Sequence, residues 1–152
     1  MKETCKYKDC SGLTSLTIPN RFIGSDIQQC SKLTSLTSLT VYGDEISSNC
    51  SQLIKNNPSL TSVTVKEVTS IGESAFSGCT GLTSINIPES VTSIGRSAFR
   101  GCSGLRSIYV YAETVPSTVA GAFEGCDSKN CTVYVPKGTY DAYWLSEWGG
   151  YI

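Results

Sequence analysis

The 152-residue sequence contains no histidine. Ser-His-Asp triads, Cys-His nucleophile pairs and imidazole metal sites all need that residue, so its absence excludes each of them. Charged residues are also scarce, at 16% of the chain with a net charge of −1. The chain therefore has no basic field that would attract nucleic acid or an anionic membrane surface, and we expect no nucleic-acid partner.

Long apolar runs are missing as well. None approaches the roughly 18 residues that a membrane span requires, so we expect no membrane insertion. The first ten residues, MKETCKYKDC, lack the apolar segment of a signal peptide. Hydroxyl groups are abundant instead, with 23 serines and 16 threonines. Uncharged, hydroxyl-rich strands suit an exposed sheet and a secreted setting. The protein is either cytosolic, or the chain is a mature or trimmed segment whose leader peptide is gone. Because the sequence begins partway through a repeat, we expect the second, a cell-surface or secreted protein whose leader peptide is absent from this chain.

One segment of the chain occurs twice. The stretch VTSIGESAFSGCTGLTSINIPE, from Val68 to Glu89, recurs as VTSIGRSAFRGCSGLRSIYVYA from Val91 to Ala112. Self-similarity at 20–30 residues predicts a solenoid, in which each coil buries its apolar face only by stacking on its neighbours. Every apolar position repeats at an offset of 23 residues: Val68/Val91, Ile71/Ile94, Phe76/Phe99, Cys79/Cys102, Leu82/Leu105, Ile85/Ile108 and Ile87/Val110.

The same spacing extends in both directions and gives about six coils over residues 1–136, the first of them partial. In the second coil a Thr-Ser-Leu triplet is doubled, and we place its strand at Leu39–Val41 because that register leads directly into the next coil. The third coil is the most divergent, with Ile54 in the phenylalanine position and Asn57 in the cysteine position.

Each coil is predicted to contain one short strand. Ile85 and Ile87 alternate with a polar residue, as in a half-buried strand, and Pro88 ends the ladder. Residues 73–77 leave room for a turn or two of helix. The predicted fold is thus an α/β leucine-rich-repeat solenoid with coils of about 23 residues. It would have one parallel sheet of short strands, and be mostly β and loop with short helical turns.

The composition changes at Lys137, and residues 137–152 are predicted to form a C-terminal cap. A short aromatic helix laid over the open end of the last coil would protect its core from water. The glycines at 149 and 150 would stop that helix. Its aromatic residues recur at near-helical spacing: Tyr140, Tyr143, Trp144 and Trp148.

The form SIGxxAFxGCxGLxSIxIP, seen from Ser70 to Pro88 and again from Ser93 to Val110, resembles the BspA-like leucine-rich repeats. That family is found mainly in surface proteins of bacteria. Its members are known or suspected adhesins for host proteins such as fibronectin and fibrinogen, so the resemblance implies an adhesive role. No family motif assigns binding to particular residues.

Most of the eight cysteines share one repeated position. We interpret them as buried free thiols that act as small apolar side chains and bond to loop backbone, a role that Asn57 can also fill. Cys5, Cys50 and Cys131 lie outside this position, and a Cys126–Cys131 or Cys5–Cys10 disulfide would close a small loop. The repeated position holds Cys10, Cys30, Cys79, Cys102 and Cys126.

Catalysis by one of these thiols would need a base and an electropositive setting. The sequence indicates neither, so we expect no enzyme activity, no cofactor and no metal site.

The candidate ligand contacts are the strand residues that alternate with the buried ones and so point away from the core. Tyr109, Tyr111 and Tyr134 fall on adjacent strands, where they would form an exposed aromatic patch. Such a patch can serve as cross-strand packing, or as a contact surface because tyrosine is enriched at interfaces. The full set of candidates is Tyr42, Thr64, Lys66, Asn86, Tyr109, Tyr111 and Tyr134.

These features favour a non-catalytic recognition module that binds a protein or glycan. The resemblance to the BspA-like repeats implies host extracellular matrix as one source of such a ligand. The alternative is a structural spacer, whose repeats present another domain at the cell surface. A spacer would carry many more repeats and a distal functional domain, whereas a recognition module would bind through this segment alone.

Overall fold

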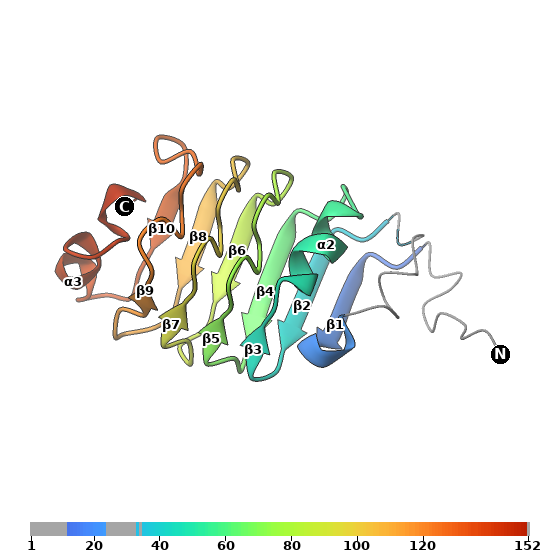
Figure 1. The fold of residues 1–152 in the computed structure, drawn as a ribbon, viewed down its shortest axis with the longest axis horizontal. Coiled ribbons are helices and arrows are strands. Elements are labelled where there is room, and N and C mark those ends of the chain that lie inside the picture. Colours follow the sequence, from blue (N-terminus) through green and yellow to red (C-terminus); the bar gives the residue numbers. More distant parts are fainter. Residues whose placement is uncertain (1–11, 24–32, 34, 152) are drawn as a thin grey trace.

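A computed structural model describes residues 12–23, 33 and 35–151 of the chain. Its main feature is a six-stranded parallel sheet with one strand per coil, so that neighbouring strands lie about one repeat apart in sequence (Figure 1). The strand order follows the chain: β1 (Ser15–Pro19), β2 (Ser38–Tyr42), β4 (Ser62–Lys66), β6 (Ser84–Ile87), β8 (Ser107–Val110) and β10 (Thr132–Tyr134). This confirms the predicted solenoid, and the bounds of β2 confirm the register chosen for the doubled triplet.

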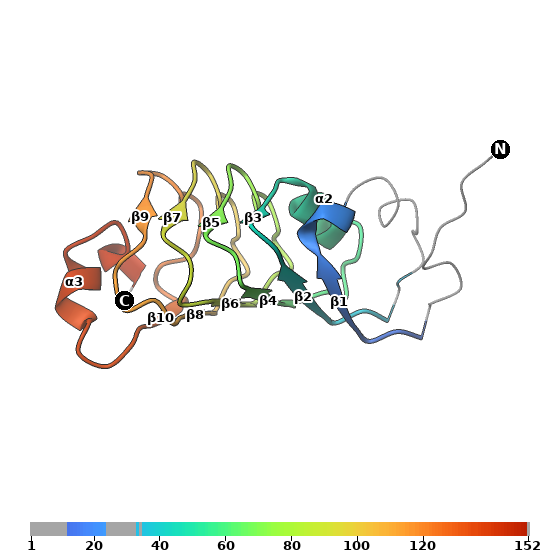
Figure 2. The same ribbon diagram turned by 90° about the horizontal axis from the view of Figure 1, so that it is seen from below.

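The prediction of a single sheet was wrong, because the coils form a second, four-stranded parallel sheet. Figure 2 shows the two sheets as opposite sides of a flattened coil. Each strand of the second sheet spans only two residues, too few for an alternating pattern to be visible in the sequence. These strands are β3 (Glu45–Ile46), β5 (Ser70–Ile71), β7 (Ser93–Ile94) and β9 (Ser117–Thr118).

Helices are short. The third coil contains α2 (Asn49–Lys55), whereas the matching residues 73–78 of the next coil form only turns. Gly78 adopts a φ of +73° in this turn, a conformation that favours glycine. The other helices within the described residues are η1 (Asn20–Phe22), α3 (Tyr140–Trp144) and η2 (Gly149–Tyr151).

The core runs along the stack between the two sheets. All seven apolar positions of the repeat are buried in both clean copies, with exposures of 3% or less. Phe99 stacks between Phe76 and Phe123, with ring centroids 5.4 and 5.3 Å away. This aromatic column forms because the repeat places one phenylalanine at the same point of successive coils. Ile54, in the phenylalanine position of the third coil, is also buried.

The repeated cysteines bond to the main chain of the preceding coil. The Cys102 thiol donates to the carbonyl oxygen of Phe76 at 2.9 Å, and the Cys126 thiol donates to that of Phe99 at 3.2 Å. Asn57 is buried in the equivalent position, but its Nδ2 donates to Leu53 in its own coil at 2.8 Å. The predicted role of the position is therefore confirmed in the coils that the structure describes.

The cysteines at 50, 79, 102, 126 and 131 are all free thiols, so the alternative Cys126–Cys131 disulfide is not formed. Cys126 is the one that lies partly at the surface. The predictions for Cys5, Cys10 and Cys30 lie outside the described residues.

The C-terminal segment closes the end of the aromatic column. The Trp148 ring lies 4.6 Å from that of Phe123, and both Trp148 and Tyr143 are fully buried. The Tyr143 hydroxyl donates to the Ala112 carbonyl oxygen at 2.6 Å. Trp148 lies beyond α3, and Gly149 and Gly150 form part of η2, so the cap is a helix followed by a turn and not one aromatic helix.

Candidate functional site

The outer face of the six-stranded sheet is polar and uncharged over most of its area, and its side chains are not part of the hydrophobic core. Its residues alternate with buried ones along each strand, and the strand registers align them in rows across the sheet. One row holds Ser15, Ser38, Ser62, Ser84, Ser107 and Thr132. The next holds Thr17, Thr40, Thr64, Asn86, Tyr109 and Tyr134.

A third row begins with Pro19, Tyr42 and Lys66. Among the outward positions that the structure describes in the six-stranded sheet, Lys66 is the only charged residue and none is Leu, Ile, Val, Met or Phe. This composition follows from the Leu-x-x-Ile-x-Ile pattern, which gives the aliphatic side chains to the core and leaves the intervening positions to Ser, Thr, Asn and Tyr.

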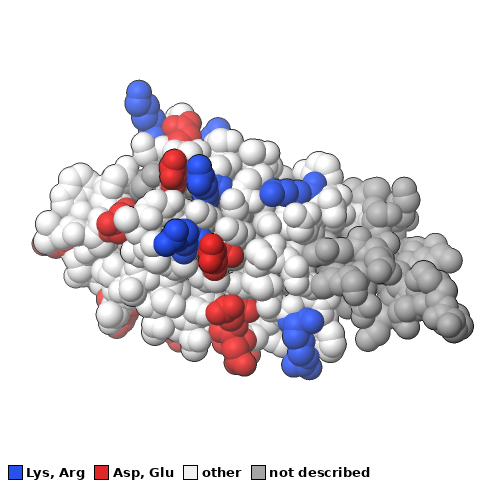
Figure 3. All heavy atoms as spheres, viewed as in Figure 1, with Lys and Arg blue, Asp and Glu red and all other residues white. Residues whose placement is uncertain are grey.

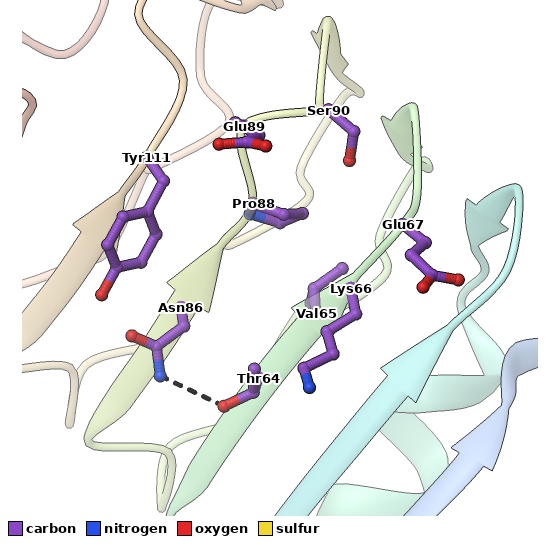
Figure 4. Close-up of a pocket in the computed structure, with 9 residues that line it drawn as sticks. All are labelled: Thr64, Val65, Lys66, Glu67, Asn86, Pro88, Glu89, Ser90 and Tyr111. Atoms are coloured by element: carbon purple, nitrogen blue, oxygen red, sulfur yellow. Dashed lines mark hydrogen bonds between the residues drawn. The ribbon is translucent and has the colours of Figure 1, made fainter.

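A groove lies where the third row continues beyond the strand ends. Pro88, just after β6, is short, whereas Lys66 on one side and Tyr111 on the other carry long side chains (Figure 4). The resulting cavity has a volume of about 410 Å³. We call it the Tyr111 groove, lined by Thr64, Val65, Lys66, Glu67, Asn86, Pro88, Glu89, Ser90 and Tyr111.

The lining combines an aromatic ring with several hydrogen-bonding groups. In Figure 4 the Tyr111 side chain runs back towards Asn86, and Lys66 extends towards Thr64. The Asn86 Nδ2 donates to the Thr64 hydroxyl at 3.1 Å, which fixes the amide in the floor of the groove. Glu67 adopts a φ of +59°, a left-handed conformation, at the turn that follows β4.

Both carboxylates of the groove stand at its rim on exposed residues. Glu89 and Tyr111 also line a neighbouring cavity of about 490 Å³, which adds a further acidic residue, Glu113. That cavity contains no lysine or arginine; its other residues are Val91, Thr92, Thr114 and Val115. The charge balance of the two cavities together is thus negative, with Lys66 as their one basic group.

The structure divides the seven candidate contacts into three places. Thr64, Lys66, Asn86 and Tyr111 come together in the Tyr111 groove. Tyr109 and Tyr134 stack on each other, while Tyr42 lines a separate cavity of about 310 Å³ beside Arg21. Tyr111 lies beyond the end of β8 and its main-chain N–H bonds to Ile87 at 3.0 Å. The predicted patch therefore consists of a stacked pair and a tyrosine that belongs to the groove.

Five lining residues of the groove were not among the predicted contacts: Val65, Glu67, Pro88, Glu89 and Ser90. Val65 is a buried residue of β4. The other four come from the turns that follow β4 and β6, where the alternation of the strand no longer applies. The sequence could have indicated these turn residues only by their place after a strand, because turns that follow parallel strands all lie at the same edge of the sheet.

Within the described part of the chain, no group of three or more metal-ligating side chains occurs, and no helix is long and apolar enough to cross a membrane. Burial raises the pKa of the Cys79 thiol to about 11 and also raises the pKa of Cys50 and Cys102. These thiols stay protonated near neutral pH and so make poor nucleophiles.

Charges elsewhere are mixed in sign. On the face seen in Figure 3, acidic and basic side chains are interspersed and most of the surface carries no charge. The ion pair in the described coils joins Arg100 and Glu124 at 3.9 Å, both of them exposed, so it contributes little to stability. This face therefore has no field of one sign that would attract a charged partner.

Comparison with known protein families gives a match over most of the chain. The family model for the BspA type leucine rich repeat region matches residues 44–140 in six copies. These residues include the whole of the Tyr111 groove, the stacked Tyr109 and Tyr134, and the aromatic column. No curated protein matches the chain.

Proposed function

Because the chain belongs to the BspA-type leucine-rich-repeat family, we propose that it is a non-catalytic, adhesin-like recognition module of a cell-surface or secreted protein. The outer face of the six-stranded sheet is the binding surface in this proposal. The main observation in its favour is that the side chains of this face are not used to pack the hydrophobic core. Its side chains alternate with the core residues, take no part in the packing between the sheets, and surround a groove of about 410 Å³.

The chemistry of the face suits recognition. Leucine-rich repeats are associated with protein binding in general, and tyrosine supplies a large amphipathic surface with few rotatable bonds. Tyr111 and Tyr134 are exposed by 55% and 48%. The ligand is a protein or a glycan, such as a component of host extracellular matrix.

Catalysis finds no support in the arrangement. Repeat solenoids of this kind are typically non-catalytic, and the sequence has no histidine to serve as a base. The carboxylates near the groove stand at exposed positions, where water solvates them.

The test is capture of ligands by the immobilised chain from a panel of extracellular matrix proteins and glycans. Asn86→Arg places a bulky charge in the middle of the outer face, whereas Thr80→Arg places the same side chain on an exposed turn away from it. If the ligand binds through the outer face, Asn86→Arg should abolish capture and Thr80→Arg should retain it. Capture by neither the chain nor its variants would favour the alternative function, a structural spacer.

A further inference from the structure

We propose that the Tyr111 groove binds an uncharged saccharide, with one sugar ring stacked on Tyr111. This inference rests on the proposed function and names the ligand class for part of its binding surface. It combines four observations: the size of the groove, the aromatic ring in it, the hydrogen-bonding groups around that ring, and the charges at its rim.

Size favours a small ligand. A cavity of about 410 Å³ falls in the range of small-molecule sites, which are clefts of about 300–1,000 Å³ with a few polar groups in a largely apolar lining. A protein partner needs about 800 Å² of contact on each side, and usually an apolar pocket for an anchoring side chain. The outward strand residues beside the groove provide hydroxyl, amide, ammonium and phenol groups. The aliphatic residues in its lining are Val65, which is buried, and Pro88.

Tyr111 provides the stacking surface. Its side chain is 55% exposed, and in Figure 4 its ring is seen face-on beside Asn86 and Pro88. The face of an aromatic ring carries a negative quadrupole, and the C–H groups on one side of a pyranose ring are weakly positive. A sugar ring laid on Tyr111 would therefore cover apolar surface on both partners and leave its hydroxyls directed sideways.

Groups that can meet those hydroxyls stand around the ring. An asparagine amide has two N–H donors and one oxygen acceptor, and Asn86 uses one donor on Thr64. Its second N–H and its oxygen have no partner among the described residues. The Lys66 ammonium adds donors on one wall, and Glu67 and Glu89 add acceptors at the rim. A hydroxyl both donates and accepts, so this mixed set matches a sugar better than it matches an apolar ligand.

The charges favour a neutral sugar over an acidic one. The groove and the neighbouring cavity contain three carboxylates, Glu67, Glu89 and Glu113, and one basic group, Lys66. A uronic acid, sialic acid or sulfated sugar would place its own negative charge among them, and like charges at an interface select against that partner.

The test measures binding of the whole chain to neutral oligosaccharides of glucose, mannose, galactose and N-acetylglucosamine. Sialylated and uronic-acid oligosaccharides of similar length provide the comparison. Binding is followed by saturation-transfer NMR and titration calorimetry. We expect at least one neutral oligosaccharide to bind, and its acidic counterparts to bind about tenfold more weakly or not at all.

Three variants localise the site. Tyr111→Ala should weaken binding about tenfold or more, while Tyr111→Phe keeps the ring and should retain affinity within about threefold. Tyr140→Ala is the matched control, because Tyr140 is another exposed tyrosine, at 51%, but lies on the cap. It should bind like the wild type. Thermal melts establish that each variant is folded.

The possible failures are distinguishable. If no neutral oligosaccharide binds at millimolar concentration, or if Tyr111→Ala binds as tightly as the wild type, the saccharide site is wrong. If the chain then still captures a matrix protein, and Asn86→Arg abolishes that capture, the recognition function stands without it. If the chain captures neither proteins nor glycans, both proposals fail.

Discussion

The rings of Tyr109 and Tyr134 stack on neighbouring strands, with centroids 4.7 Å apart and planes within 9° of parallel. The two residues are register partners in β8 and β10, so the parallel ladder itself sets this contact. Part of the predicted aromatic patch therefore stabilises the sheet. The structure supports cross-strand packing for this pair. Tyr111, the third tyrosine of the predicted patch, lies beyond the end of β8 and is not part of this stack.

The stack should be measurable as a coupling energy. In a double-mutant cycle with Tyr109→Ser and Tyr134→Ser, we expect the two changes to be non-additive by about 0.5–1.5 kcal/mol in the free energy of unfolding, the range for aromatic pairs. Urea denaturation of the four proteins gives the value. Additivity within about 0.3 kcal/mol would show that the stack contributes nothing in solution.

Truncation of a phenylalanine in the aromatic column should lower the free energy of unfolding far more than loss of the tyrosine stack. Phe99 is fully buried between two other phenylalanine rings, so Phe99→Ala leaves a cavity that neighbouring coils can fill only by shifting. We expect a loss of about 3–5 kcal/mol in the free energy of unfolding. A loss below about 1 kcal/mol would mean that Phe99 does not occupy the core.

The buried thiols should be unreactive in the native protein. Cys79 and Cys102 are at most 1% exposed, and burial raises the pKa of both, to about 11 for Cys79. Partly exposed Cys126 should react first with a neutral thiol reagent at pH 7.5, and the other two only after unfolding. A disulfide between Cys79 and Cys102, found by mass spectrometry, would contradict the structure.

The same pKa shifts predict sensitivity to alkali. An unfolded cysteine ionises near pH 9, whereas Cys79 and Cys126 ionise near pH 11 in the folded state. Between these values the unfolded state holds fewer protons, so stability should fall as the pH rises from about 9 to about 11. Cys79→Ala should make that fall shallower. Denaturation curves at several pH values measure it, and an unchanged slope in Cys79→Ala would contradict the assignment.

The cap should depend on one buried hydrogen bond. Tyr143→Phe removes the hydroxyl that donates to Ala112 and leaves a buried carbonyl without its partner. We expect a loss of about 1–3 kcal/mol, the usual cost of an unsatisfied buried group. Tyr140→Phe, on the exposed side of the same helix, is the control and should change stability by less than about 0.5 kcal/mol. Equal losses in both variants would contradict the account of the cap.

The coil could be predicted from the sequence because its signals are local and repeated. Ile85 and Ile87 specify a strand by alternation, and their counterparts 23 residues later specify its neighbour. The second sheet could not be predicted, since a strand such as Ser93–Ile94 is too short to carry a pattern. It forms because the main sheet holds successive coils in register.

The groove was predictable only in part. Asn86 and Lys66 are outward residues of neighbouring strands, so the alternation along each strand predicts that they lie on the same face of the sheet. The contribution of Glu67 and Glu89 depends on how two turns fold at the sheet edge, which no periodicity describes. The direction of the Tyr111 side chain beyond the end of β8 is likewise a property of the assembled structure.

The central claim, that the outer face of the sheet is a recognition surface, is tested most directly by the affinity of the double variant Tyr109→Ser, Tyr111→Ser. Its free energy of unfolding should fall by at most about 1–2 kcal/mol, from lost cross-strand contacts. Its binding to any ligand that the chain captures should weaken by about 2 kcal/mol or more, roughly 30-fold in Kd. A folded double variant that binds every such ligand as tightly as the wild type would contradict the claim.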